Sequence, residues 1–246
     1  MFLSITASNL FDASQGLGIN QATAFTFFVG TMAMMAASAF FFFEIRNVGE
    51  KWRTSVLVSG LITFIAAVHY YYMRDYFIQT GSSPTFFRYV DWLLTVPLMC
   101  VEFYLITKKA GAKQSLLWKL ILASVVMLVT GFFGEATDRS HSVLWGVISG
   151  AAYFYIAYLV WFGEVASLAQ TAGPSVAKAT RILAWFVLVG WAIYPLGYII
   201  GTPGGLFGMF GSELNNPWMD VVYNIGDAVN KIGFGLVIYS LSRKAA

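Results

Sequence analysis

The hydrophobic positions of this chain gather into seven long runs separated by short polar connections. Each run is apolar on nearly every side, whereas the strand of a membrane barrel would alternate apolar and polar residues. A helix needs about 20 residues to cross a bilayer, and every run is long enough. The predicted membrane helices are Asn20–Phe43, Thr54–Met73, Tyr89–Thr107, Ser115–Gly134, Ser142–Gly163, Ile182–Gly201 and Val221–Ser242.

The composition indicates an integral membrane protein. Hydrophobic residues make up 58% of the chain and charged residues 11%, and the mean hydropathy is +0.69. The connections are too short for a soluble domain, and no repeat or low-complexity segment is evident, so residues 1–246 are predicted to form one all-α seven-helix bundle. We expect Met1–Gly18, which lacks the basic region of a secretory signal, to be a mature extracellular end.

Lysine and arginine residues fall mainly on one side of the predicted bundle. Eleven lie near the ends predicted to be cytoplasmic, and only Arg74, Arg88 and Arg139 lie near the others. Because basic residues that flank helices are retained in the cytoplasm, this predicts an external N-terminus and a cytoplasmic C-terminus. We expect a multi-pass protein of the cell membrane. Contact with anionic lipid accounts for the net charge of +3 without a nucleic-acid partner.

Four ionisable residues lie deep within the predicted helices: Asp91, Glu102, Asp227 and Lys231. A charged side chain at such a depth costs about 3 kcal/mol on insertion scales, so these residues are candidates for function. Lys231 is near the middle of the last helix, and Asp227 precedes it by one helical turn. An amine held out of water beside a carboxylate is suited to covalent modification or proton exchange.

The third predicted helix carries a polar stripe. Arg88, Asp91, Thr95 and Glu102 are spaced by 3, 4 and 7 residues, which places them on one helical face. Glu102 lies about 16 Å further inward than Asp91 at a rise of about 1.5 Å per residue. A proton that leaves the Lys231 amine towards Asp91 and is replaced from Glu102 would move outward. The chain has no P-loop glycine motif and nothing that absorbs visible light, so a ligand or an ion gradient must supply the energy.

Three segments resemble motifs of the microbial rhodopsins. Arg88–Pro97, with the sequence RYVDWLLTVP, is similar to their third-helix signature. Trp191–Pro195, with the sequence WAIYP, resembles their sixth-helix motif, and Asp227–Lys231 matches their retinal site. The resemblance covers essentially the whole chain. It implies a retinal chromophore and a transporter or photoreceptor, not an enzyme.

The resemblance also implies particular roles. The triplet Asp91, Thr95 and Glu102 is similar to that of proteorhodopsins and xanthorhodopsins, which are light-driven outward proton pumps. All-trans retinal would be attached to Lys231 as a protonated Schiff base. Asp91 would be the primary proton acceptor and Asp227 the second counterion. Glu102 would be the cytoplasmic proton donor.

A further set of residues would tune the counterions: His69, Tyr70, Arg88 and Thr95. A lone buried histidine is more often structural, but proteorhodopsins carry a histidine at the place of His69 that is bonded to the acceptor. The resemblance implies that His69 and Asp91 titrate as a coupled pair. It also implies a hydrogen bond between Tyr70 and Asp227.

The predicted retinal pocket contains Trp92, Met99, Met127, Trp191, Tyr194 and Tyr223. Each of these side chains has an ordinary packing role as its alternative, because 17% of the chain is aromatic. Met99 falls at the colour-tuning position of the family. An apolar residue there resembles the green-absorbing forms.

Two sequence features leave two explanations open. Gly146 matches a place where xanthorhodopsins have a glycine that opens a window for a hydroxylated carotenoid antenna, but Gly146 and Gly150 also form a GxxxG pattern for close helix packing. Pro195 should kink the sixth helix, either as a static kink or as a hinge. Homo-oligomers are usual in this family.

The main alternative function is a photosensory rhodopsin that signals to a separate transducer. The carboxyl group of Glu102 favours the pump, because fast reprotonation from inside serves turnover. Asp91 disfavours chloride transport, the triplet typical of sodium pumps is missing, and a channel has no positive support.

The remaining charges and the single cysteine receive ordinary explanations. Cys100 is expected to pack. Glu135, Asp138, Arg139 and His141 are interpreted as a solvated outer loop, with proton release as the lesser alternative. Glu164, Glu213 and Asp220 are placed at helix ends or in loops, and no metal site is predicted.

Overall fold

The computed structural model describes residues 18–201 and 217–244. The predicted extracellular segment up to residue 17 and Glu213 lie outside these ranges. The α-helices are α1 Ile19–Glu44, α2 Glu50–Thr80, α3 Thr85–Thr107, α4 Gln114–Phe132, α5 Ser142–Trp161, α6 Glu164–Thr171, α7 Pro174–Trp185, α8 Ile193–Gly201 and α9 Pro217–Lys244. Short 3₁₀ or π turns are η2 Ile45–Asn47, η3 Lys108–Ala110, η4 Phe133–Thr137, η5 Arg139–His141 and η6 Phe186–Gly190.

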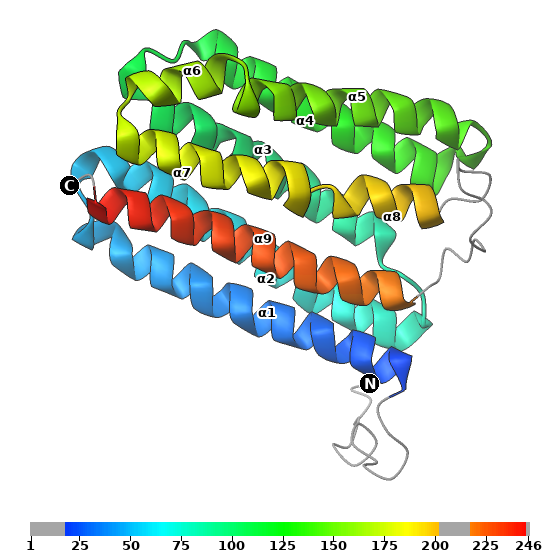
Figure 1. Cartoon of the computed structure of the whole chain (residues 1–246). Helices are drawn as coiled ribbons and strands as arrows, with labels where there is room; N and C mark the ends of the chain where they lie inside the picture. The colour runs from blue at the N-terminus through cyan, green and yellow to red at the C-terminus, as the bar shows by residue number, and fades with distance from the viewer. Residues whose placement is uncertain (1–17, 202–216, 245–246) are drawn as a thin grey trace.

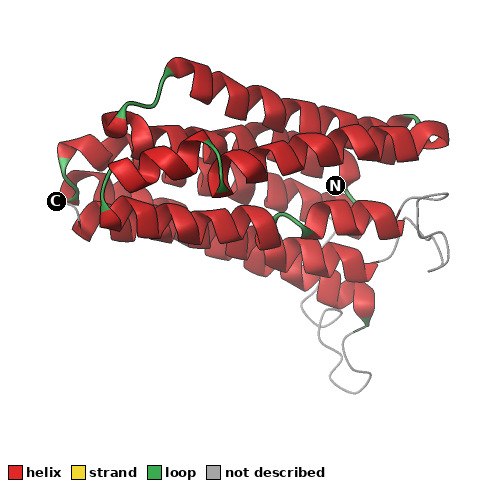
Figure 2. Cartoon of the chain, turned by 45° about the horizontal axis from the view of Figure 1, so that its top comes forward, coloured by secondary structure: helices red, strands yellow, loops and turns green. Residues whose placement is uncertain are grey.

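The long helices lie side by side as one bundle (Figure 1). Within the described ranges, seven helical stretches are long and apolar enough to cross a membrane, so the predicted seven-helix bundle is confirmed. The sixth of them consists of α7, η6 and α8. Short loops join the helices (Figure 2), and α1 begins at the end of the bundle opposite to the end of α9 (Figure 1).

Some predicted boundaries were too narrow. The prediction for α2 was Thr54–Met73, but the helix runs from Glu50 to Thr80 and ends where Gly81 takes a left-handed φ of 66°. Polar residues extend such helices beyond the hydrocarbon, where hydropathy gives no signal. The prediction also missed α6, whose Val165 and Ala169 face the bundle while the rest of this short helix is polar or partly exposed.

Small residues bring α1, α2 and α9 close together. A Cβ atom on Gly30 of α1 would lie 2.9 Å from the Tyr70 ring of α2. A Cβ atom on Gly235 of α9 would lie 2.5 Å from the Phe41 ring of α1. In lipid there is no hydrophobic driving force between helices, so the van der Waals contacts of such close packing hold them together instead. It brings α9, which carries Lys231, against the other two helices.

The predicted interruption by Pro195 is present in the sixth membrane stretch. Proline has no N–H group, so Trp191 O cannot receive its usual helical hydrogen bond and accepts from Tyr194 N at 3.1 Å instead. The turn before it widens into η6, where Trp191 N donates to Phe186 O at 2.9 Å. Whether this irregular turn acts as a hinge stays a prediction.

Side chains of neighbouring helices satisfy the carbonyl groups of this irregular turn. Asn230 Nδ2 of α9 donates to Gly190 O at 2.9 Å, and Tyr153 Oη of α5 donates to Leu188 O at 2.7 Å. A carbonyl group without a partner is costly in a membrane interior. These two side chains therefore stabilise the break beside Trp191.

Candidate functional site

Lys231 lies at the centre of a buried ionic cluster. Its side chain is 2% exposed, and Nζ donates to Asp91 Oδ2 at 2.5 Å and to Asp227 Oδ2 at 2.6 Å. Asp227 precedes Lys231 by one turn of α9, and Asp91 comes from α3. The expectation of a carboxylate close to the amine is confirmed. The Lys231 ammonium group therefore lies between two carboxylates, and each of them is placed to accept a proton from it.

His69 stands near this cluster without a hydrogen bond to it. Its Nδ1 atom lies 2.9 Å from Ile65 O, a carbonyl that can only accept, so Nδ1 carries the hydrogen. The same Nδ1 atom is 4.0 Å from Asp91 Oδ1. The predicted neighbourhood of the two residues is present, but direct bonding is not. Tuning of Asp91 by His69 stays a prediction.

Asp227 receives its hydroxyl hydrogen bond from Tyr194, whose Oη lies 2.9 Å from Asp227 Oδ1. The interpretation of Tyr70 as this donor is wrong. Tyr70 Oη donates to Tyr223 O at 3.4 Å, one helical turn before Asp227 on α9. Tyr194 thus connects the ionic cluster to the aromatic side chains around it.

Thr95 and Arg88, the other two predicted tuning residues, do not hydrogen-bond to the carboxylate oxygens of Asp91 or Asp227. Thr95 Oγ1 donates to the backbone oxygen of Asp91 at 2.9 Å. Arg88 Nη2 donates to Asp220 Oδ1 at 2.9 Å. Asp220 lies in the first turn of α9, so its predicted place at a helix end is confirmed. It is only 2% exposed, however, and is therefore not an ordinary solvated charge.

Asp220 and Asn224 are site residues that the sequence interpretation missed. A signal existed: Asp220, Asn224, Asp227 and Lys231 are spaced by 4, 3 and 4 residues, which places them on one face of α9. Asn224 Nδ2 donates to Thr26 Oγ1 of α1 at 3.0 Å. The polar stripe on α9 therefore faces the one on α3.

Glu102 is fully buried on the other side of Lys231. Ser59 Oγ of α2 donates to Glu102 Oε1 at 3.3 Å, and Oε2 has no hydrogen-bond partner among the described residues. The ring of Phe103, next to Glu102 on α3, meets the ring of Phe234, three residues after Lys231 on α9, at 5.6 Å between centroids. Among the described residues, no hydrogen bond joins Glu102 to Lys231, Asp91 or Asp227.

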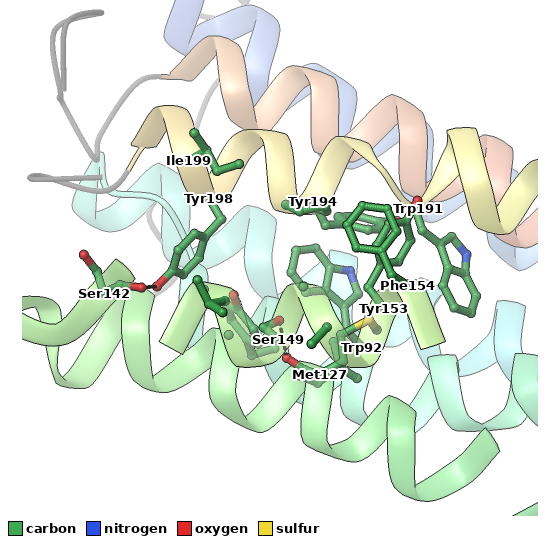
Figure 3. A pocket seen from close by; sticks show the side chains of 18 of the residues that line it. Trp92, Met127, Ser142, Ser149, Tyr153, Phe154, Trp191, Tyr194, Tyr198 and Ile199 are labelled. Atoms are coloured by element: carbon green, nitrogen blue, oxygen red, sulfur yellow. Dashed lines mark hydrogen bonds between the residues drawn. The ribbon is translucent and has the colours of Figure 1, made fainter. Parts of the chain in front are cut away.

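A cavity of about 360 Å³ lies between α3, α4, α5 and α8. Trp92, Met127, Trp191 and Tyr194 line it, as predicted for the retinal pocket (Figure 3). Met99 and Tyr223 were predicted as well but are not part of the lining. The Tyr223 ring lies behind the wall, stacked on Tyr194 at 6.0 Å between centroids, and Met99 is buried in the core.

The cavity also has walls that the sequence did not single out, notably Tyr153 and Tyr198. Tyr198 Oη donates to Ser142 O at 2.6 Å and so ties α8 to α5, as Figure 3 shows. Nothing in the sequence distinguishes these two tyrosines from the other aromatic residues. Gly146 lines the cavity beside Tyr198, and its place next to the retinal ring stays a prediction.

The outer loop and its surroundings contain two separate clusters. Tyr89 Oη donates to Glu135 Oε2 at 2.7 Å, and the Glu135 side chain is only partly exposed. Asp138 accepts hydrogen bonds from Ser140 and Trp145. Solvation thus describes Asp138 better than Glu135. Among the described residues, no group of three His, Cys, Asp or Glu side chains could hold a metal ion.

Fold and site together define a seven-helix membrane protein built around a buried lysine with two carboxylates beside an aromatic cavity. The sequence profile of the bacteriorhodopsin-like proteins matches residues 21–245. The chain belongs to this family, the microbial rhodopsins.

Relatives and solved structures agree with this assignment. The green-light absorbing proteorhodopsin of Gamma-proteobacterium EBAC31A08 is 44% identical over 98% of this chain and 95% of its own. The blue-light absorbing proteorhodopsin of Gamma-proteobacterium Hot 75m4 is 46% identical over 94% and 90%. The structure of xanthorhodopsin, described as a light-driven ion pump with dual chromophore, has a TM-score of 0.80 at 28% identity and covers 93% of this chain and 94% of its own.

Proposed function

We propose that this protein is a light-driven outward proton pump that carries all-trans retinal covalently on Lys231. The observation that carries the proposal is the buried Lys231 amine, which lies within hydrogen-bond distance of both Asp91 and Asp227. A third buried carboxyl group, Glu102, makes no described hydrogen bond to this cluster. The similarity to proteorhodopsins and xanthorhodopsin supports it.

The cavity and the amine suit retinal. The walls are almost entirely apolar and aromatic, as a polyene requires, and Tyr194 reaches from the wall to the carboxylate beside Lys231. Trp92, Met127 and Trp191 would hold the chain and ring of the chromophore. When bound, retinal supplies absorption of visible light and a light-dependent change in the proton affinity of the Lys231 nitrogen.

The first proton transfer follows from the shortest contact at the site. The N–H bond at Lys231 breaks and an O–H bond forms at Asp91 Oδ2, 2.5 Å away. Asp227 stays charged because Tyr194 donates to its second oxygen and holds it as the remaining counterion. Loss of the positive charge at Lys231 is thereby matched by loss of one of its two negative partners.

Glu102 supplies the replacement proton from the cytoplasmic side. Its surroundings contain two serines and otherwise apolar groups, and an uncharged acid is the form suited to such a place. After it gives its proton to the Lys231 nitrogen, it takes another from the cytoplasm. This order of transfers moves one positive charge outward. A photosensor has little need of fast reprotonation from Glu102.

An infrared difference spectrum after a flash tests the acceptor. The native pigment should show a new C=O band of a protonated carboxylic acid as the Lys231 nitrogen loses its proton. The Asp91→Asn variant should lack that band. The same band in the variant would assign the acceptor to another residue.

We further propose that a hydroxylated carotenoid reaches the cavity past Gly146. A Cβ atom there would lie 2.8 Å from Tyr198 Cε1, so any larger residue would displace the tyrosine ring, and at Gly150 no atom lies within 4 Å of such a Cβ. The open space at Gly150 does not support the GxxxG packing explanation at that position. Added zeaxanthin should contribute its absorption to the retinal excitation spectrum, and Gly146→Trp should remove that contribution. An excitation spectrum without it contradicts the antenna proposal.

Other predicted properties follow from the same proposal. Met99 predicts green absorption, which overall identity does not decide because the green-absorbing and blue-absorbing relatives are 44% and 46% identical. The seven membrane stretches make this a multi-pass membrane protein. Residence in the cell membrane, the external N-terminus and assembly into homo-oligomers belong to the proposal.

A further inference from the structure

Arg88 and Asp220 form a buried ion pair that the proposed proton path does not use. The side chains of both residues are 3% exposed, and Arg88 Nη2 lies 2.9 Å from Asp220 Oδ1. Ser83 Oγ donates to the same Oδ1 atom at 2.8 Å, and Arg88 Nη2 also lies 3.4 Å from Asn224 Oδ1. Asp220 is thus held by the segment before α3 as well as by α3 itself.

Aromatic rings hold the guanidinium in the same place. Arg88 Cζ lies 4.8 Å from the centroid of the Tyr223 ring on α9 and 5.8 Å from that of Phe27 on α1. A cation over such faces gains attraction in addition to its hydrogen bonds. The guanidinium is therefore anchored towards α1 and α9.

The neighbour that Arg88 does not contact is Asp91. The two residues are three apart on one face of α3, a spacing at which side chains can meet. In the described structure, however, the only cations within 4.0 Å of the Asp91 carboxylate are Lys231 and, when protonated, His69. Asp91 Oδ1 and the Nε and Nη1 atoms of Arg88 have no hydrogen-bond partner among the described residues.

We propose that Asp220 is a positioning residue that holds the Arg88 guanidinium away from Asp91, so that Lys231 alone balances the charge of the acceptor. This inference rests on the proposed function, in which Asp91 accepts the proton. Arg88 and Asp220 together are neutral. A cation turned instead towards Asp91 would stabilise the carboxylate and make proton acceptance harder.

Several titratable groups face these three residues and remain unchanged in the tests. They are His69 and Tyr70 on α2, Tyr89 on α3, Glu135 in η4, and Tyr194, Tyr223, Asp227 and Lys231 on α8 and α9. Their contributions are common to every variant below, so differences between variants report on Arg88 and Asp220.

The test is a pH titration of the visible absorption of the purified pigment. Protonation of Asp91 removes a negative charge beside the Lys231 nitrogen and shifts the absorption to longer wavelength. Asp220→Asn keeps the shape of the side chain but frees Arg88 to turn towards Asp91. The midpoint of the colour change should move to lower pH by about one unit or more. Asp220→Glu should restore a midpoint near the native one.

Arg88→Gln shows whether the shift caused by Asp220→Asn depends on Arg88. Without Arg88 the buried Asp220 is a neutral acid, so its replacement by Asn neither removes a charge nor frees a cation. Asp220→Asn in the Arg88→Gln background should therefore shift the midpoint much less than in the native background. An equal shift in both backgrounds overturns the proposal.

The Arg88→Gln variant alone also tests the proposal. This test still works if the Asp220→Asn variant does not fold. A buried Asp220 left without its cation takes up a proton, so a neutral pair is replaced by a neutral acid. The midpoint should then stay near the native value. A rise of about one unit or more would mean that Arg88 already stabilises the Asp91 carboxylate, which contradicts the proposal. Failure of the native chain to form a pigment with retinal would instead contradict the proposed function.

Discussion

The two halves of the bundle on either side of Lys231 differ in how their polar groups are connected. On the side predicted to face outside, Asp91, Asp227 and Tyr194 form a continuous set of contacts with Lys231. On the side predicted to be cytoplasmic, Glu102 accepts a hydrogen bond from Ser59, and no described hydrogen bond joins it to the amine. A proton can pass from Lys231 to Asp91 through an existing contact, whereas its replacement from Glu102 has no such contact to follow. This asymmetry is what a one-way transfer needs.

Replacement of Lys231 should have the largest effect, because both halves converge on this residue. Lys231→Ala removes the amine and should give no pigment with all-trans retinal. Lys231→Arg is the matched control: it keeps a positive charge between the two carboxylates but has no nucleophilic amine. Visible absorption spectra of both purified variants check this. Colour in either one contradicts the proposed linkage.

Asp91→Asn should break the outward half while the pigment remains. The variant should absorb at longer wavelength, because a negative charge beside the Lys231 nitrogen is lost. Outward transport should fall to background, because the nearest proton acceptor is gone. Illumination of vesicles that contain the variant, with Asp91→Glu as the control that keeps a carboxylate, measures this. Undiminished transport by the asparagine variant would exclude Asp91 as acceptor.

Glu102→Gln should affect the inward half alone. The early photocycle should be unchanged and the late decay slower by about 100-fold or more, the usual loss when a general acid is removed. Azide or low pH should restore the rate by supplying protons from solution. Flash spectroscopy of the late decay measures this. A native decay rate in the variant would remove Glu102 from the donor role.

Asp138, in the loop between α4 and α5, should give the smallest effect. Hydrogen bonds from Ser140, Trp145 and His141 lower the pKa of this carboxyl group from 3.8 to about 2. Because its pKa is lowered in the folded protein, its contribution to the loop is complete above about pH 4 and lost as the pH falls through about 2. The NMR signal of the Trp145 indole N–H should change over that interval, and in Asp138→Asn it should not. A native signal that stays constant would contradict the assignment.

The fold was largely predictable because lipid imposes a simple pattern. Apolar runs located all seven membrane stretches, and proline chemistry located the break before Pro195. The short α6 was not predictable from hydropathy, because it has only eight residues and buries only Val165 and Ala169. The widening of η6 depends on donors from other helices, among them Asn230 and Tyr153, which are far away in the sequence.

The site was predictable where it follows the spacing along one helix. Asp227 contacts Lys231 from one turn away on α9, as expected. The contact of Asp91, which lies on α3, was expected only from the resemblance to microbial rhodopsins. Which hydroxyl reaches Asp227 depends on how two helices are rotated against each other, so Tyr194 could not be preferred over Tyr70 from sequence. The burial of Asp220 was missed for another reason. A charge near a helix end is usually solvated, but here Ser83 and Arg88 contact Asp220 in place of water.

The most direct test of outward pumping is the external pH of a lightly buffered suspension of cells that express this chain with all-trans retinal. Under illumination the medium should become more acidic, and a protonophore should abolish the change. Alkalinisation that the protonophore enhances would mean that another ion is moved. A pigmented suspension without any light-dependent change would contradict the pump and favour a photosensor.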